Sequence, residues 1–177
     1  SQQSKRATAV LRIGVMGASA TATEMAAATP KQAYDISGPL DPTRFYPRSG
    51  LLPAVVEVRG QTGPWDTVGQ TRMLMLSDGG HVVETITDTI SPTSFAYELS
   101  DFQKLFGALV KGARAGWRFE RTAEGTSIQW TYTFFGKPGR GWIVGLIVRL
   151  LWGPYMQKVL PPIAHEVSRQ AAARAEA

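Results

Sequence analysis

Residues 113–135 read ARAGWRFERTAEGTSIQWTYTFF, and large apolar and polar side chains alternate along them, which is the clearest indication of the fold in the chain. Successive side chains of a β-strand point to opposite faces of the sheet. In the second half, one face carries Ile128, Trp130, Tyr132 and Phe134, and the other carries Ser127, Gln129, Thr131 and Thr133. Ala123-Glu124-Gly125 supplies the turn between the halves. The stretch therefore predicts an antiparallel hairpin, Ala113–Arg121 with Thr126–Phe135, that has one aromatic face.

The aromatic face continues onto the strand that precedes this hairpin, Thr93–Leu99. The side chains predicted on the inner, ligand-binding face are Phe95, Tyr97, Trp117, Phe119, Trp130, Tyr132 and Phe134. Two interpretations remain open, a fully packed core without a cavity and a cavity that holds a ligand. Indole N–H and phenol O–H groups need hydrogen-bond partners when they are buried, which favours the ligand-filled interior.

Further strands and two short helices are expected upstream. Strand patterns cover Ala20–Ala28, Pro53–Arg59, Thr67–Leu76 and His81–Ile90. The last two flank Ser77-Asp78-Gly79-Gly80, a strong hairpin signal because glycine accepts the positive φ angles of tight turns. Thr29-Pro30 and Asp41-Pro42 each place a capping side chain before a proline, which is typical of a helix start.

A helical pattern runs from Arg140 to about Arg174. A break or kink is expected at Gly153-Pro154 and again at Pro161-Pro162, because proline removes a backbone donor and clashes with the preceding turn. Asp101–Gly112 is less regular and predicts a short helical turn. The expected fold class is α+β, with a curved antiparallel sheet of about seven strands around a long C-terminal helix and two short helices after the first strand.

Charged side chains interrupt the apolar pattern of 67–90. Glu84 and Asp88 share the face of aliphatic neighbours in one strand, and Arg72 does so in the other. In turn registers that put both on the same face, Arg72 and Glu84 are close across the hairpin. A buried pair of this kind is either a polar anchor in an apolar pocket or an ion pair that braces the sheet. If the opposite face is the inner one, Met73 and Met75 line the interior and both charges are solvated.

Composition excludes several classes of protein. The chain of 177 residues fits one domain and contains no Cys, which excludes disulfides and thiol nucleophiles. His81 and His165 are its only histidines, so no metal site or cofactor is expected. The net charge is +5, but the basic residues gather in 1–12 and 137–177 and form no coherent patch on the central fold, so nucleic acid is not an expected partner.

Neither end of the chain predicts a membrane span or a nucleotide site. The apolar run Gly141–Leu151 is interrupted by Arg149 and is shorter than the roughly 20 residues of a span, which predicts a soluble, cytoplasmic protein. Gly14, Gly17 and Ala20 have dinucleotide-fingerprint spacing, but no alternating strand–helix units follow them. Residues 1–19 are expected to be a loosely ordered extension, and residues 20–177 a single ligand-binding domain.

Short motifs along the chain are similar to those of one family. They are Gly50-Leu51-Leu52-Pro53-Ala54-Val55, Gly63-Pro64-Trp65-Asp66, Leu76-Ser77-Asp78-Gly79-Gly80, Phe95-Ala96-Tyr97, Gly116-Trp117-Arg118-Phe119 and Gly125-Thr126-Ser127-Ile128-Gln129-Trp130. Through them the chain resembles the polyketide cyclase/dehydrase and lipid-transport branch of the START-like (SRPBCC) superfamily. The resemblance implies the helix-grip fold and a cavity for hydrophobic small molecules between sheet and helix. It implies no catalytic residue, because no single catalytic motif unites the family.

Three functions follow, in order of preference. Binding or carriage of a lipid, polyketide or aromatic metabolite needs only an apolar cavity with a few polar groups, here Arg72 and Glu84. A cofactor-independent cyclase or dehydrase is the alternative, with Glu84, Arg72 and Asp88 as candidate catalytic residues. A membrane-surface adaptor through residues 142–155 comes third, since that segment is apolar and flanked by bases. Helical phase argues against it, because the sheet is expected to bury the stripe Ile143, Leu146, Ile147, Leu150 and Leu151.

Overall fold

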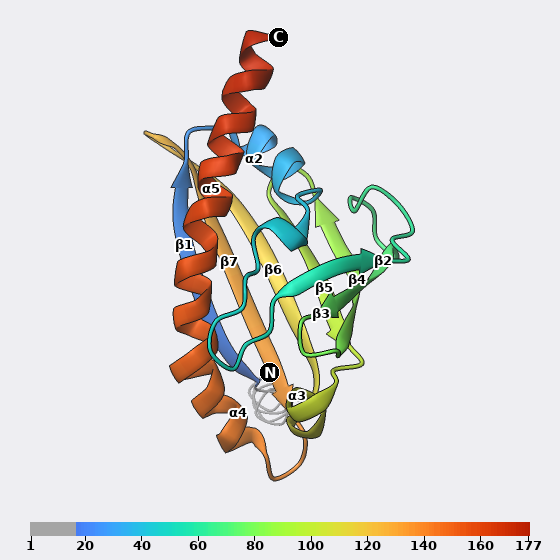
Figure 1. The fold of residues 1–177 in the computed structure, drawn as a ribbon. Coiled ribbons are helices and arrows are strands. Elements are labelled where there is room, and N and C mark those ends of the chain that lie inside the picture. Colours follow the sequence, from blue (N-terminus) through green and yellow to red (C-terminus); the bar gives the residue numbers. More distant parts are fainter. Residues whose placement is uncertain (1–16) are drawn as a thin grey trace, which may run out of the picture.

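The structure, a computed structural model, describes residues 17–177. Its strands form one antiparallel sheet in the order β1-β7-β6-β5-β4-β3-β2 (Figure 1). The strands are β1 (Ala18–Ala26), β2 (Val55–Arg59), β3 (Thr71–Leu76), β4 (His81–Ile90), β5 (Ser94–Ser100), β6 (Val110–Thr122) and β7 (Gly125–Gly136). Residues 1–16 of the predicted extension, 1–19, lie outside the described residues, and Ala18 and Ser19 are in β1.

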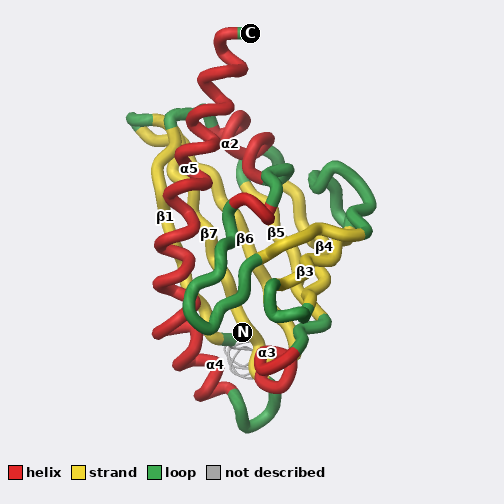
Figure 2. The backbone as a smooth tube through the Cα atoms, in the orientation of Figure 1, coloured by secondary structure: helices red, strands yellow, loops and turns green. Residues whose placement is uncertain are grey.

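Helices cover one face of this sheet. They are α2 (Pro30–Ser37), the 3₁₀ helix η1 (Pro42–Arg44), α3 (Lys104–Leu109), α4 (Gly141–Ile147), the π-helix η2 (Val148–Trp152) and α5 (Gly153–Glu176). Figure 2 shows the strands as one layer with the C-terminal helix running along it, and α5 packs against β1 and α2. The sheet and the long helix confirm the predicted α+β, helix-grip arrangement.

Both predicted helix starts are observed. The Thr29 hydroxyl accepts a hydrogen bond from the Gln32 backbone N–H at 3.2 Å, and the Gln32 side chain accepts one from the Thr29 N–H at 2.9 Å. These bonds satisfy two donors that the first turn of α2 leaves free. Asp41 caps η1 by accepting from the Thr43 N–H at 3.0 Å. Local side-chain chemistry therefore fixes where the chain leaves β1 and where it re-enters the core.

The hairpin between β3 and β4 follows the sequence prediction at its turn but not at its start. Gly79 has φ +85°, and the Leu76 N–H donates to the Gly80 carbonyl at 2.9 Å. β3 begins at Thr71 and not at Thr67, because the Gln70 side chain closes a turn by accepting from the backbone N–H groups of Asp66 and Thr67. The predicted strand was four residues too long for that reason.

At Gly153-Pro154, where a break or kink was predicted, α5 begins, and the five residues before it, Val148–Trp152, form a π-helix. Pro154 has no N–H for the carbonyl four residues earlier, and the Gly153 N–H donates to the Val148 carbonyl, five residues back. The predicted break at Pro161-Pro162 is wrong, since α5 continues through both prolines. Both prolines are exposed. The carbonyls that lose their donors belong to Gln157 and Lys158, which are also exposed, so these carbonyls are on the solvent side of the helix.

Of the stripe that the sheet was expected to bury along α4 and η2, Ile143 and Ile147 are partly buried against the core and the three leucines are not buried. Val144 and Val148 face the core, while Leu146, Leu150 and Leu151 are exposed. α4 contacts β1 and β7, and Val144 and Val148 lie on one side of the helix while Leu146 and Leu150 lie on the other. The helical periodicity of residues 142–155 therefore gives no reason to exclude a membrane-facing position for Leu146, Leu150 and Leu151.

Candidate functional site

A cavity of about 300 Å³ lies between the inner face of the sheet and the C-terminal helix. Strands β3, β4, β5 and β7 supply its wall, the loop before β2 and helix α3 supply another side, and residues 147–155 close it. Most lining side chains are apolar. Leu51, Leu105 and Leu151 line the cavity and are also exposed, so they mark its mouth.

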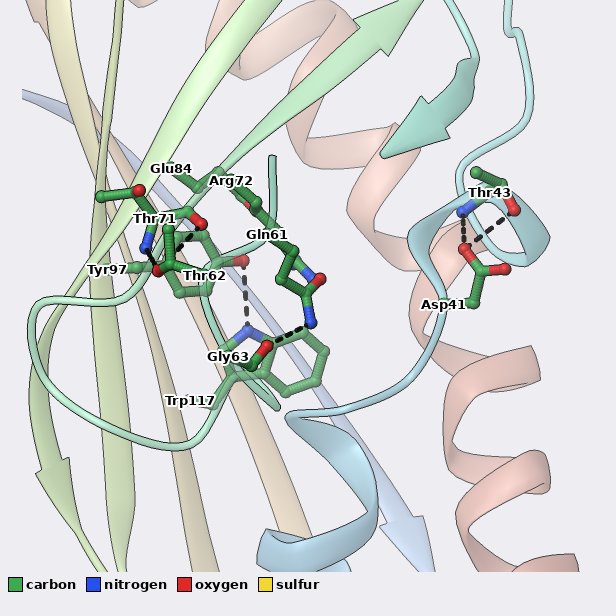
Figure 3. A network of polar contacts seen from close by, with 10 residues as sticks. All are labelled: Asp41, Thr43, Gln61, Thr62, Gly63, Thr71, Arg72, Glu84, Tyr97 and Trp117. Carbon is green, nitrogen blue, oxygen red and sulfur yellow. Dashed lines mark hydrogen bonds and ion pairs between the residues drawn. The ribbon is translucent and has the colours of Figure 1, made fainter. Parts of the chain in front are cut away.

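Arg72 and Glu84 form a buried ion pair in the wall of this cavity. The two residues are directly opposed across β3 and β4, and Arg72 Nε donates to Glu84 Oε1 at 2.7 Å (Figure 3). Both side chains are buried. The Trp65 ring lies 4.0 Å from the Arg72 guanidinium carbon and covers it. The interpretation with both charges on the inner face is confirmed, and Met73 and Met75 belong to the other face.

The environment makes this pair an unusual electrostatic site. Burial raises the pKa of the Glu84 carboxyl, and the hydrogen bond and charge of Arg72 offset part of that rise. Within the described residues, Nε is the one guanidinium nitrogen of Arg72 that has a protein acceptor. Its remaining N–H groups are donors for a polar group of a bound molecule.

Four tyrosines also line the cavity, Tyr46, Tyr97, Tyr132 and Tyr155. Burial raises the pKa of each, that of Tyr155 to about 12, so all four stay neutral and can donate hydrogen bonds. The Tyr97 hydroxyl accepts from Trp117 Nε1 at 3.5 Å (Figure 3), and Tyr155 donates to the Pro47 carbonyl at 2.8 Å. The cavity thus has a polar inner part, and its mouth combines exposed leucines with the polar side chains of Asp78, Gln103 and Lys104.

Several residues of the site were missed from the sequence. Tyr46, Trp65, Trp152 and Tyr155 come from loops and from the C-terminal helix, whose position over the sheet strand alternation does not give. Trp152 is the last residue of the π-helix, and its Nε1 is buried without an acceptor in the described part of the chain. The aromatic residues within the apolar segment 142–155 could have indicated that Trp152 packs against the cavity.

Asp88, the third candidate catalytic residue, is outside the cavity. The pairing of β4 with β5 shifts between Ile86 and Asp88, and this bulge turns Asp88 to the outer face. There Arg114 Nη2 bonds its carboxylate at 2.5 Å and lowers the pKa of Asp88. Strict alternation placed Asp88 with Glu84, and the bulge makes that prediction wrong.

The predicted aromatic residues divide into two groups. Tyr97, Tyr132 and Phe134 line the cavity together with the Arg72–Glu84 pair. Phe95 and Trp117 line a second, smaller pocket of about 30 Å³, and Phe119 and Trp130 line neither. Trp117 and Trp130 are stacked with ring centroids 5.3 Å apart. The second group is therefore core packing beneath the site.

Asp78 and Lys104 also line the cavity, whereas His81 lies away from it. His81 Nε2 is 2.6 Å from Asp101 Oδ2 at the beginning of β4. Within residues 17–177, no group of three or more His, Asp or Glu side chains could hold a metal ion. The chemistry that the site offers is hydrogen bonding and charge from Arg72, Glu84 and the tyrosines.

Comparisons with known proteins agree with this architecture. A family model described as "Polyketide cyclase / dehydrase and lipid transport" matches residues 17–167. No protein of curated function matches the chain. Among solved structures, a protein from Nitrosospira multiformis has a TM-score of 0.61 at 11% identity over 87% of this chain and 99% of its own.

Two further solved structures are similar to the same degree. The protein XoxI from Bacillus cereus has a TM-score of 0.57 at 13% identity, over 85% of this chain and 95% of its own. A protein from Thermobifida fusca has a TM-score of 0.56 at 20% identity, over 85% of this chain and 93% of its own. At these identities the likeness shows the fold alone.

Proposed function

We propose the following function for this chain, which belongs to the polyketide cyclase/dehydrase and lipid-transport family of SRPBCC proteins: it binds and carries a hydrophobic small molecule that has one polar end. The main support for this function is the apolar cavity of about 300 Å³ with the Arg72–Glu84 pair in its wall. Small-molecule sites are mostly apolar clefts of about 300–1,000 Å³ with a few fixed polar groups. This cavity matches that description at its lower limit.

The polar groups orient the ligand in this proposal. The free N–H groups of Arg72 and the neutral hydroxyls of Tyr97 and Tyr132 suit a hydroxyl, carbonyl or carboxylate group of the ligand. The apolar remainder then extends toward Leu105 and Leu151 at the mouth. The test is native mass spectrometry of freshly purified protein. A hydrophobic molecule that co-purifies with the protein is expected to appear as added mass, and its mass identifies the ligand.

Filling the cavity is expected to weaken binding. Val82 lines the cavity and is buried, so Val82→Phe places extra side-chain volume where the ligand lies. Overpacking of about 1–3 kcal/mol corresponds to a loss of about 5- to 150-fold in affinity. The measurement is titration with the fluorescent apolar probe anilinonaphthalene sulfonate, followed by its displacement by the co-purified molecule.

Val83→Phe is the matched control, because Val83 belongs to the same strand and lines neither pocket. It is expected to keep the affinity of the unmodified protein. Equal affinities for both variants, with circular dichroism showing that both are folded, would contradict binding in this cavity.

The enzymatic alternative, a cyclase or dehydrase, has one observation in its favour. Glu84 is a buried carboxyl with a raised pKa inside a ligand-sized cavity, the environment of many general bases. Glu84 is held in an ion pair with Arg72, and Asp88, the other candidate carboxylate, lies outside the cavity, which favours carriage. We therefore rank carriage first.

Glu84→Gln separates carriage from catalysis. The amide keeps the size of the side chain and an acceptor for Arg72 but takes up no proton near neutral pH, so carriage predicts ligand affinity within a few fold of the unmodified protein. A general base at this position predicts a loss of about 10²- to 10⁴-fold in turnover of a cyclisable ligand. Binding and product formation are measured on the same variant with the same ligand.

A further inference from the structure

Large apolar side chains are exposed at one end of the molecule, where α3 and α4 are in contact (Figure 1). Trp142, Leu146 and Leu150 are 69%, 46% and 63% exposed and repeat every fourth residue, so they form one outward stripe along α4 and η2. Leu105 of α3 is 62% exposed. We call these four residues together with Leu51 and Leu151 the end face. Contiguous exposed apolar side chains of this kind mark an interaction surface.

Basic side chains predominate around the end face. Residues 102–119 and 125–165 contain no Asp or Glu, and they include Lys104, Lys137, Arg140 and Arg149 next to the apolar stripe. Lys137 Nζ and Arg140 Nη1 donate to the carbonyls of Gly107 and Ala108, which ties α3 to the start of α4. The acids nearest in sequence and at the cavity are Asp101, which is bonded to His81, and Asp78. The end face is therefore apolar and basic.

The end face is continuous with the mouth of the cavity. Leu51, Leu105 and Leu151 belong to the end face and also line the cavity, as does Lys104. A hydrophobic molecule that leaves the cavity passes these side chains before it meets water. A surface that covered the end face would receive the molecule directly.

We propose that the end face docks onto the surface of an anionic lipid bilayer, with the cavity mouth toward the lipid. Trp and Leu side chains insert at the boundary between head groups and acyl chains, and Lys and Arg bind anionic head groups while their stems stay apolar. The proposal concerns contact with the surface and not a span. The helix Gly141–Glu176 is long and apolar enough to cross a membrane, but its α5 part is packed on β1 and α2.

The test uses the full chain and vesicles of phosphatidylcholine with roughly one-third phosphatidylserine. The unmodified protein is expected to co-sediment with these vesicles and to bind pure phosphatidylcholine vesicles about tenfold or more weakly, since each nearby base adds to the attraction. The triple variant Trp142→Ser, Leu146→Ser, Leu150→Ser is expected to lose at least about tenfold in partitioning. The double variant Lys104→Glu, Arg149→Glu is expected to lose binding to the anionic vesicles.

The matched control is the triple variant Val56→Ser, Val68→Ser, Ile90→Ser. These side chains are also large, apolar and exposed, but they belong to β2, the loop before β3 and the end of β4. The control is expected to bind vesicles as the unmodified protein does. Trp142 is the one exposed tryptophan of the five, so a lipid brominated along its acyl chains should quench its fluorescence and leave that of Trp117 and Trp130.

The role of docking in delivering a ligand rests on the proposed function. The docking itself does not, since vesicle binding is measured without a cavity ligand. Unchanged binding by the Trp142 triple variant, or equal losses for it and the control, would overturn it. So would a dimer, seen by scattering, that the triple variant abolishes while vesicles stay unbound, because the end face would then bind a second copy. Titration with anilinonaphthalene sulfonate in vesicle-free solution reports on the cavity separately.

Discussion

Arg72→Leu and Glu84→Leu are each expected to lower the free energy of unfolding by about 3–5 kcal/mol, and the double Leu variant is expected to lose less than either. Arg72 Nε and Glu84 Oε1 are 2.7 Å apart and both side chains are buried, so each single change leaves one buried charge without its partner. The double change removes both charges and leaves apolar side chains in an apolar wall. Chemical denaturation of the four proteins gives the coupling between the two sites.

The two single variants are expected to differ in their pH dependence. In Arg72→Leu, Glu84 loses the partner that offset the effect of burial, so its folded-state pKa rises further above the unfolded value. A raised folded-state pKa adds stability below the unfolded value and loses it as pH rises through the folded pKa. The deficit of Arg72→Leu is therefore smaller at about pH 4 than at about pH 7.

The loss of stability in Glu84→Leu is not expected to become smaller in acid. The Arg72 guanidinium stays charged throughout this pH range, and the deficit is expected to persist. Denaturation curves of both variants at the two pH values make the comparison. Small, additive losses at either pH would show that the ion pair is solvated, and the polar inner part of the cavity would lose its basis.

Trp130→Ala is expected to lower the free energy of unfolding by about 3–5 kcal/mol, because it removes a fully buried indole. Trp130 stacks on Trp117 and meets Tyr46, Tyr132 and Trp152 edge-on at ring-centroid distances of 5.9–6.5 Å. It lies behind the wall of the cavity and braces the residues that line it. Thermal and chemical denaturation measure the loss.

Trp142→Ala is the matched control for this prediction, with an expected change within about 0.5 kcal/mol, because Trp142 is exposed. Trp130→Phe keeps an aromatic ring in the core and is expected to bind anilinonaphthalene sulfonate as the unmodified protein does. A small loss of stability in Trp130→Ala together with a large loss of probe binding in Trp130→Phe would place Trp130 in contact with the ligand and not in the core.

Local chemistry made much of the fold readable from the sequence. Alternation in 113–135 places Trp117 and Trp130 on the buried face, and the structure confirms both. The capping box at Thr29 and the glycine turn at Gly79 are satisfied by residues within a few positions. Strand pairing across the short 77–80 turn also put Arg72 and Glu84 together. Each of these features depends on residues that are close together in the sequence, so each can be predicted without knowledge of the tertiary structure.

Tertiary structure decided the features that depend on distant partners. The bulge that turns Asp88 outward arises in the pairing of β4 with β5, and strict alternation does not contain it. Trp65 covers Arg72, and Trp152 enters the cavity, because the chain folds back over the sheet. Leu146 and Leu150 are exposed because α4 packs on β1 and β7 with the side that carries Val144 and Val148. Periodicity gives a side chain's direction relative to its own strand or helix, and only long-range packing decides whether core, cavity or solvent lies in that direction.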